Sequence, residues 1–143
     1  MTKMILQDQA AGLRNLVSFR AADSARVFTI AGGTTRVGKT SVAVNLATAL
    51  AKNGQRVLLI DENPCHNSIC TNLGLQARFD LLHVINKDKK LNQVLLQGPE
   101  NITILSAMRG IHTLNKLNSH EQNWLIKSFS ELTETVDIVL IDT

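Results

Sequence analysis

Residues 33–40, with the sequence GTTRVGKT, match the pattern G-x-x-x-x-G-K-[ST] at each of its fixed positions. An apolar run at residues 27–31 precedes this pattern, and a helical segment at residues 41–53 follows it. Glycines at 33 and 38 let the backbone bend sharply, so that successive N–H groups and the positive end of the next helix point at one anion. The pattern therefore predicts a strand, a phosphate-binding loop and a helix, a unit typical of α/β sheets.

The residue types in this loop indicate a nucleoside triphosphate with Mg²⁺. We expect the Lys39 ammonium group to reach the β- and γ-phosphates and the Thr40 hydroxyl to complete the magnesium shell. The predicted nucleotide-binding residues are Gly33, Thr34, Thr35, Arg36, Val37, Gly38, Lys39, Thr40 and Ser41.

The composition of the 143 residues fits one domain at most and argues against several other classes of protein. The formal net charge is +3, and no dense basic run indicates a nucleic-acid or lipid surface. No segment approaches the length of a membrane span, and the N-terminus lacks the apolar stretch of a signal peptide. Cys65 and Cys70 predict neither a disulfide nor a zinc site, and the four histidines show no metal-binding spacing.

Beyond the loop, apolar strands alternate with helical segments. Asn53 and Gly54 predict the end of the first helix, and Ser119 with Gln122 forms a capping box that opens a late one. Continuous apolar strands between helices predict a three-layer P-loop α/β fold, with a mostly parallel sheet flanked by helices. The remaining predicted elements are strands at 56–60, 102–105 and 136–141 and two short helices at 80–85 and 88–97, each opened by an aspartate.

Two parts of the chain are expected to differ in role. Residues 1–25 are predicted to form a helix and a polar connector, and residues 26–143 the N-terminal portion of a nucleotide-binding domain. The chain stops at the tip of its last predicted strand, where a sheet of this kind normally continues. We therefore expect a chain truncated after that strand, with the segments that would distinguish ATP from GTP lying beyond it.

Polar side chains occupy the predicted ends of two strands, where the loops of an open α/β sheet gather around a ligand. Asp61 ends the second strand, Asn63 lies two residues further on, and Asp142 ends the last strand. We predict that Asp61 and Asp142, with Thr40, form the magnesium site. Each aspartate can alternatively serve only as a cap of its strand end.

These motifs resemble, in order and spacing, those of the MinD/ParA group of deviant-Walker ATPases. The matching segments are the phosphate loop followed by SVAVNLA, then VLLIDEN at 57–63, LGL at 73–75 and DIVLID at 137–142. The resemblance covers residues 26–143 and implies ATP and Mg²⁺ as cofactors. It also implies Lys39, Asp61 and Asn63 as catalytic residues, a nucleotide-dependent homodimer and a cytoplasmic protein.

The N-terminal tail resembles one branch of that group. Residues 8–14, DQAAGLR, are similar to the D-Q-A-x-x-L-R helix of the flagellar-number regulators called FlhG or FleN. In that branch the helix stimulates an FlhF-type flagellar GTPase, so the resemblance implies such a partner. The residues implied to contact it are Asp8, Gln9, Ala10, Leu13 and Arg14. Full-length relatives end in a membrane-targeting helix, so the resemblance implies attachment to the inner face of the plasma membrane only for a longer chain.

Two positions depart from the family pattern. The lysine that reaches across the dimer in the family is replaced by Thr34, which carries no charge; Arg36 is one candidate substitute. The aspartate that orients the attacking water is replaced by Asn63, which can hold a water but cannot accept a proton. We therefore predict that nucleotide binding is kept and that hydrolysis is slow or depends on a partner.

Two other functions stay open from the sequence. One is a nucleotide-binding scaffold or GTPase activator that does not hydrolyse ATP. The other is a partitioning ATPase that binds DNA, which would require a basic surface cluster and leaves the DQAAGLR segment unexplained. No specific nucleic-acid partner is expected.

Overall fold

The computed structural model describes residues 25–32, 38–63 and 68–143. The described helices are α2 (Lys39–Lys52), α3 (Ile69–Asn72), α4 (Leu81–Ile85), α5 (Leu91–Val94), α6 (Met108–Leu114) and α7 (Ser119–Thr133), with a 3₁₀ turn, η2, at Pro99–Asn101. The described strands are β1 (Arg26–Ile30), β2 (Val57–Asp61), β3 (Leu96–Gln97), β4 (Thr103–Ser106) and β5 (Ile138–Asp142).

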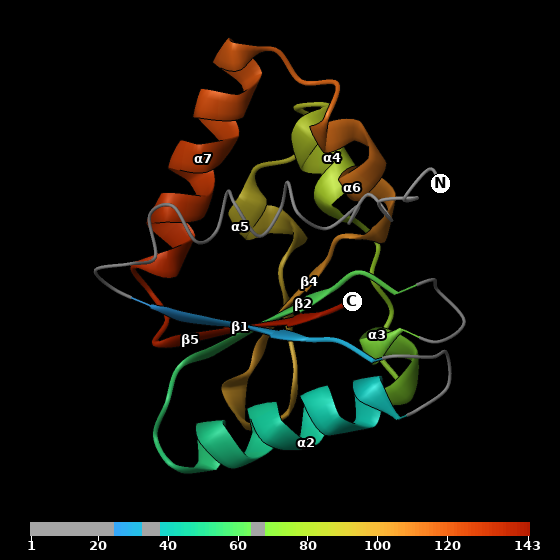
Figure 1. The fold of residues 1–143 in the computed structure, drawn as a ribbon, viewed down its shortest axis with the longest axis vertical. Helices are drawn as coiled ribbons and strands as arrows, with labels where there is room; N and C mark the ends of the chain where they lie inside the picture. Colours follow the sequence, from blue (N-terminus) through green and yellow to red (C-terminus); the bar gives the residue numbers. More distant parts are fainter. Residues whose placement is uncertain (1–24, 33–37, 64–67) are drawn as a thin grey trace, which may run out of the picture.

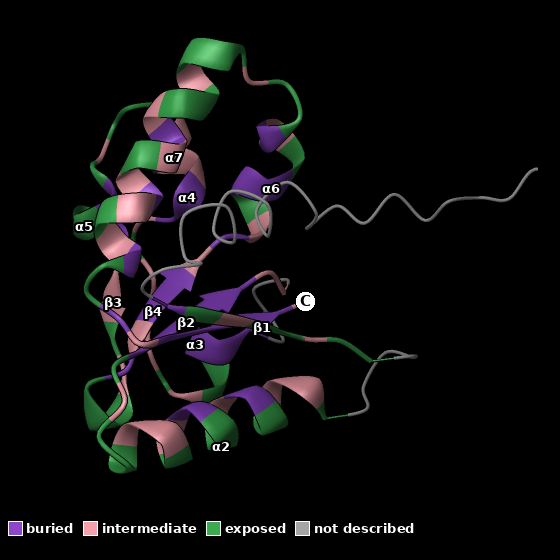
Figure 2. Ribbon diagram, turned by 60° about the vertical axis from the view of Figure 1, so that its left-hand side comes forward, coloured by how far each residue is buried: buried purple, intermediate pink, exposed green. Residues whose placement is uncertain are grey.

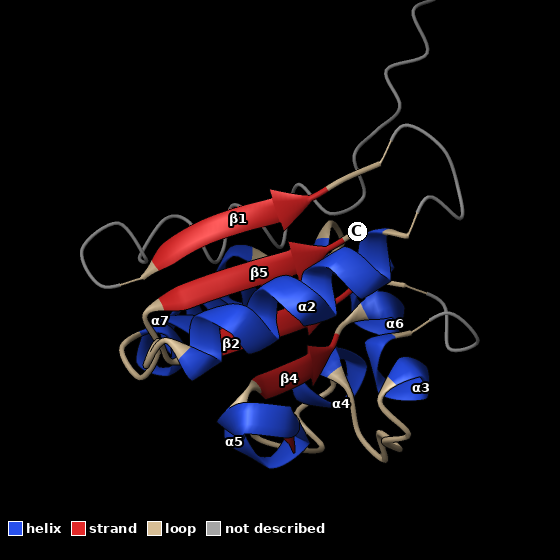
Figure 3. Ribbon diagram, turned by 90° about the horizontal axis from the view of Figure 1, so that it is seen from below, coloured by secondary structure: helices blue, strands red, loops and turns tan. Residues whose placement is uncertain are grey.

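The strands form one sheet in the order β1-β5-β2-β4-β3. The pairs β1–β5, β5–β2 and β2–β4 are parallel, and the short β3 runs antiparallel to β4 at one edge. Because the long strands are parallel, their carboxyl ends lie at one edge of the sheet, and α2 begins at the same edge (Figure 3). This arrangement confirms the predicted α/β P-loop fold with a mostly parallel sheet.

Side-chain alternation divides the interior into two cores, one on each face of the sheet. In β2, Leu58 and Ile60 belong to the core between the sheet and the helices α4–α7. Val57 and Leu59 belong to the core between the sheet and the helices α2 and α3. All four side chains are at most 2% exposed. The sheet is thus a buried middle layer with α2 on one face and α4–α7 on the other (Figures 1 and 2).

The helix α2 is held close to the sheet by small residues. Ala43 and Ala47, one turn apart, are completely buried against the sheet, so the helix axis approaches it closely. The helix begins at Lys39, two residues before the predicted start, immediately after Gly38 with its positive φ of 83°. It ends at Lys52, and Gly54, with φ of 85°, gives the predicted left-handed turn.

The helix α7 begins one residue earlier than the predicted capping box requires. Asn118 Oδ1 accepts a hydrogen bond from Glu121 N at 2.9 Å, and Glu121 Oε2 accepts one from Asn118 N at 2.9 Å. The box is therefore formed by Asn118 and Glu121, and the prediction of Ser119 and Gln122 was wrong. Asparagine caps a helix at least as well as serine, so both registers fit the sequence pattern and the tertiary structure selects one of them.

The predicted helix at 88–97 is also wrong in its extent. The residues just after α4 still donate hydrogen bonds to a carbonyl group of that helix. Asp88 N and Lys89 N both donate to the His83 carbonyl oxygen. The next helix therefore starts only at Leu91 and ends at Val94, and Leu96 already belongs to β3. By contrast, Asp80 caps α4 as predicted, accepting a hydrogen bond from Leu82 N at 3.1 Å.

Short elements account for most of the other differences. The sequence analysis did not predict α3, α6, β3 or η2, each of which has seven residues or fewer. Three predicted strands start one or two residues later than predicted: β2 at Val57, β4 at Thr103 and β5 at Ile138. The strand β1 starts one residue earlier, at Arg26. In β5 the shift follows from Asp137, whose carboxylate binds Arg56 in the turn before the strand.

Among the described residues, no helix combines the length and the apolar character needed to cross a membrane. Large apolar side chains that remain exposed in this part of the chain are Phe28 on the edge strand β1 and Val42 and Leu46 on α2. The tail at residues 1–24 lies outside the described residues, so the predicted domain boundary near residue 25 stays a prediction.

The contact between α6 and α4 gives a test of the core. A Cβ atom added at Gly110 would lie 2.8 Å from Leu81 Cγ, inside the fully buried Leu81 side chain. We expect Gly110→Ala to lower the free energy of unfolding by about 1–3 kcal/mol because the two helices must move apart. Urea unfolding measures this change. His112→Ala, at an exposed position of the same helix, is the control and should change it by less than about 0.5 kcal/mol; equal effects would contradict the packing argument.

Candidate nucleotide site

Two buried aspartates lie side by side at the carboxyl edge of the sheet. Asp61 and Asp142 are partners in the parallel register of β2 and β5 and are 1% and 0% exposed. Both follow the side-chain alternation of the core against α2, since Leu59 and Leu140 two residues earlier pack there. The two carboxylates therefore point to the face of the sheet at which α2 begins.

The first turn of α2 brings the predicted phosphate-loop residues to these strand ends. Thr40 Oγ1 donates a hydrogen bond to Asp142 Oδ2 at 2.9 Å, across 102 positions of the sequence. Lys39 Nζ donates to the Thr143 backbone oxygen at 2.6 Å, just beyond β5. Thr40 and Lys39 thus lie next to the end of the last strand, and their roles toward phosphate and metal stay predictions.

Asn63 connects the two aspartates. Its Nδ2 atom donates to Asp142 Oδ2 at 2.7 Å and to Asp61 Oδ1 at 3.1 Å. Its backbone N–H also donates to Asp61 Oδ1, at 3.0 Å. A neutral amide group therefore lies between two carboxylates and donates to both. An aspartate at this position would have no N–H group to donate and would add a third negative charge.

Asp61 also shapes the chain beyond the strand. Its Oδ2 atom accepts a hydrogen bond from Ile69 N at 2.7 Å, at the start of α3. One carboxylate thus ties both ends of the segment from residue 63 to residue 69. The sequence analysis gave Asp61 a role in metal binding and catalysis or, alternatively, as a cap of its strand end, and no local pattern signals this bond to Ile69.

Burial dominates the electrostatics of the pair. Desolvation raises the pKa of Asp61 to about 6, and the neighbouring Asp142 charge adds to this, although hydrogen bonds from Asn63 and Ile69 oppose it. Desolvation also raises the pKa of Asp142, against the opposing effects of Thr40, Lys39 and Asn63. The site therefore disfavours two adjacent negative charges and is suited to a cation.

The donor set fits Mg²⁺ bound together with a nucleotide. Asp142 Oδ1 is buried and has no hydrogen-bond partner among the described residues, so one carboxylate oxygen at the site is left for a ligand. Hydroxyl and carboxylate oxygens are the ligands that Mg²⁺ prefers, and such sites often use only one or two carboxylates plus phosphate oxygens. In the described ranges, no group of three or more His, Cys, Asp or Glu side chains could hold a metal.

Part of the predicted site lies outside the described residues. This applies to Gly33, Thr34, Thr35, Arg36 and Val37 of the loop and to the tail residues Asp8, Gln9, Ala10, Leu13 and Arg14. Gly38 directly precedes α2, and Ser41 is exposed in its first turn. The described structure therefore brings together Lys39, Thr40, Asp61, Asn63 and Asp142.

A cavity of about 350 Å³ adjoins the site. Asn63 forms part of its wall, together with Ser106, the last residue of β4, and residues of α3 and α6. Arg78 and the ion pair between Arg109 and Asp80 also line it. The cavity opens at the carboxyl edge of the sheet, next to the carboxylate pair.

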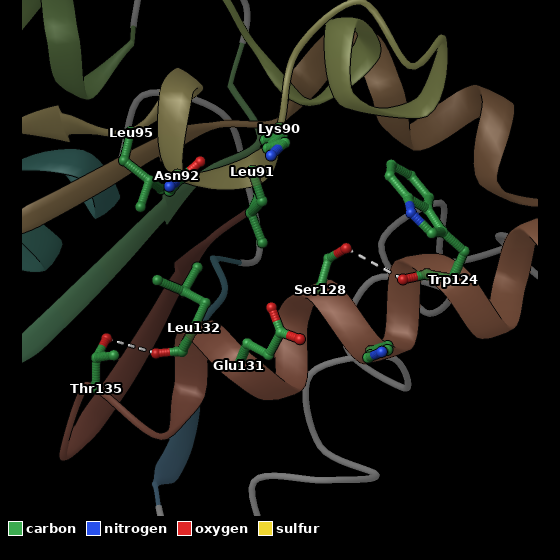
Figure 4. Close-up of a pocket in the computed structure, with 10 residues that line it drawn as sticks. Lys90, Leu91, Asn92, Leu95, Trp124, Ser128, Glu131, Leu132 and Thr135 are labelled. Carbon is green, nitrogen blue, oxygen red and sulfur yellow. Dashed lines mark hydrogen bonds between the residues drawn. The ribbon is translucent and has the colours of Figure 1, made fainter.

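A larger groove of about 760 Å³ lies elsewhere, between α5 and α7. Leu91, Leu132 and Trp124 line it, on the face of the sheet opposite α2 (Figure 4). It contains none of the predicted site residues, so its size does not make it the nucleotide site.

Known proteins are similar to this chain in sequence. The AAA domain family matches residues 25–143. The antiactivator FleN of Pseudomonas aeruginosa is 36% identical over 118 residues, covering 82% of this chain and 42% of FleN. The septum site-determining protein MinD of Bacillus subtilis is 33% identical over 116 residues, covering 79% of this chain and 42% of MinD.

The chain belongs to the MinD/ParA-type P-loop ATPases. Among solved structures, cobyrinic acid a,c-diamide synthase from Mycobacterium smegmatis, with a bound ATP analogue and magnesium, has a TM-score of 0.65. It is 24% identical, over 82% of this chain and 50% of the synthase, and this likeness supports the fold alone. Because it covers 42% of FleN and 42% of MinD, the chain spans less than half the length of these relatives.

The raised pKa of Asp61 predicts a specific pH dependence. Because the pKa rises from 3.8 in the unfolded chain to about 6, the folded protein keeps a proton that the unfolded chain has already lost. The contribution of Asp61 to the free energy of unfolding is therefore present in full below about pH 4 and is lost as the pH rises through 6. A carboxyl ¹³C NMR titration should give a midpoint near 6 for Asp61. Asp137, whose pKa Arg56 lowers to about 2, is the internal control; a midpoint for Asp61 near 4 would contradict this account.

Proposed function

We propose that this chain is the nucleotide-binding part of a FleN-like regulator of flagellar number and placement. The similarity to FleN and the DQAAGLR segment at residues 8–14 support this assignment. The main structural support for nucleotide binding is the cluster of Lys39, Thr40 and Asp142 at the end of β5.

In this function the chain binds ATP with Mg²⁺. Lys39 contacts the terminal phosphates once its bond to the Thr143 backbone oxygen is exchanged for them. Thr40 keeps its bond to Asp142 and offers its hydroxyl oxygen to the metal. A bound metal would neutralise charge on the phosphates, and Asp61 and Asp142 would be the carboxylates that hold it.

Hydrolysis by this chain is slow or depends on a partner. Asn63 stands where the family has the aspartate that orients the attacking water, and its Nδ2 atom is already committed to two carboxylates. Thr34 stands where the family has the lysine that crosses a dimer. A nucleotide-dependent homodimer therefore requires another cation, and Arg36 is the candidate.

The proposal also gives the N-terminal segment at residues 8–14 a second protein to act on. In this proposal Gln9, with Asp8, Ala10, Leu13 and Arg14, contacts an FlhF-type flagellar GTPase and stimulates its GTP hydrolysis. In this proposal the protein works in the cytoplasm.

A titration with fluorescent ATP tests the nucleotide site. We expect Lys39→Ala to weaken Mg²⁺-dependent binding roughly 10- to 100-fold, because it removes a charged donor to the phosphates. Lys52→Ala is the matched control, since it removes the same charge from an exposed position in the last turn of α2. Equal affinities of the wild type and Lys39→Ala would contradict the proposed site.

A GTPase assay tests the role of the tail. We expect deletion of residues 1–20, or the substitution Gln9→Ala, to abolish stimulation of the FlhF-type GTPase and to leave ATP affinity within about twofold, because the phosphate loop lies elsewhere in the chain. Gln7→Ala, two residues from Gln9, is the matched control. Stimulation that persists without the tail would reject the flagellar assignment, whatever the affinity for ATP.

A further inference from the structure

We propose that Asn63 is a positioning residue whose side-chain amide competes with Mg²⁺ for the carboxylate of Asp142, so that binding of the metal releases this amide. The inference rests on the proposed function, because it concerns the same magnesium site. It assigns Asn63 a role in metal binding in addition to its place near the attacking water.

The first step of the argument is the occupancy of Asp142. Its Oδ2 atom accepts two hydrogen bonds, one from Asn63 Nδ2 at 2.7 Å and one from Thr40 Oγ1 at 2.9 Å. Asn63 Nδ2 also lies 3.3 Å from the Asp142 backbone oxygen. The amide is thus held against this residue by two contacts, and Asp142 Oδ1 is the carboxylate atom left without a partner in the described part of the chain.

The second step separates the two donors. A threonine hydroxyl can donate to a carboxylate and still offer its oxygen to a cation, so Thr40 and Mg²⁺ are compatible. An amide nitrogen only donates, so Asn63 Nδ2 cannot ligate a cation. A cation at the free Asp142 Oδ1 shares this carboxylate with the amide N–H groups on Oδ2, and its charge repels their partial positive charge. The cation and the amide therefore compete for the negative charge of one carboxylate.

The third step is electrostatic. In the absence of metal, the amide N–H groups lie between Asp61 and Asp142 and reduce the repulsion between two carboxylates that are almost completely buried. A dication neutralises these charges far better than a neutral amide does. The amide is therefore a weak internal substitute for the cation, held in place when the metal is absent.

The test measures the concentration of Mg²⁺ that gives half-maximal binding of a non-hydrolysable fluorescent ATP analogue to the full-length protein. We expect Asn63→Ala to lower this concentration by about tenfold, because the competing hydrogen bond to a charged group is removed. Asn63→Ser, a smaller change in polarity, should act in the same direction. Asn72→Ala is the matched control, since the Asn72 amide donates to the Ser68 backbone oxygen and not to either carboxylate.

A second readout does not involve nucleotide. Mg²⁺ alone should raise the thermal unfolding temperature of Asn63→Ala and Asn63→Ser more than that of the wild type, and Asn72→Ala should behave as the wild type. Unfolding curves without Mg²⁺ verify that each variant is folded.

Two results would overturn the inference and leave the proposed function intact. One is an unchanged Mg²⁺ requirement in folded Asn63→Ala and Asn63→Ser, and the other is a higher requirement, which would make Asn63 a support of the metal. A wild-type protein that binds no nucleotide at any Mg²⁺ concentration would reject the proposed function itself.

Discussion

The position of Asp61 next to Asp142 determines how the candidate site is arranged at the carboxyl ends of the strands. Parallel pairing of β2 and β5 sets the two residues opposite one another, and the alternation along each strand turns both side chains toward α2. A shift of the register by one residue would send one carboxylate into the opposite core. The apolar residues that precede each aspartate therefore determine the geometry of the site as well as the stability of the sheet.

The two cores place the remaining parts around this pair. Ala43 and Ala47 bring α2 close to the sheet, and this closeness allows Thr40, one turn earlier, to reach Asp142. On the other face, α4, α5, α6 and α7 cover Leu58 and Ile60 without contributing to the pair. One face thus carries the carboxylate pair, and the other holds the core that contains Phe129.

Much of this could be predicted from the sequence, because the signals are local. The loop pattern around Lys39 and the apolar strands ending at Asp61 and Asp142 each lie within a few residues. What could not be predicted depends on distant contacts or on choices between near-equal alternatives. The bond from Ile69 N to Asp61 joins residues eight positions apart, and no sequence motif marks it. The capping box at Asn118 has an equally plausible alternative at Ser119. The bridging position of Asn63 depends on Asp142, 79 residues away.

The bond from Lys39 to the Thr143 backbone oxygen has a consequence for how ligands enter. The lysine already has an acceptor, and Asp142 already has donors, so the arrival of a ligand is an exchange of partners. A phosphate group without a cation would displace the lysine's acceptor and leave the aspartates unchanged; a cation without phosphate would do the reverse. In the proposed function, only the two together would replace both sets of internal bonds, so the site would respond to the complete metal–nucleotide complex and not fully to either part alone.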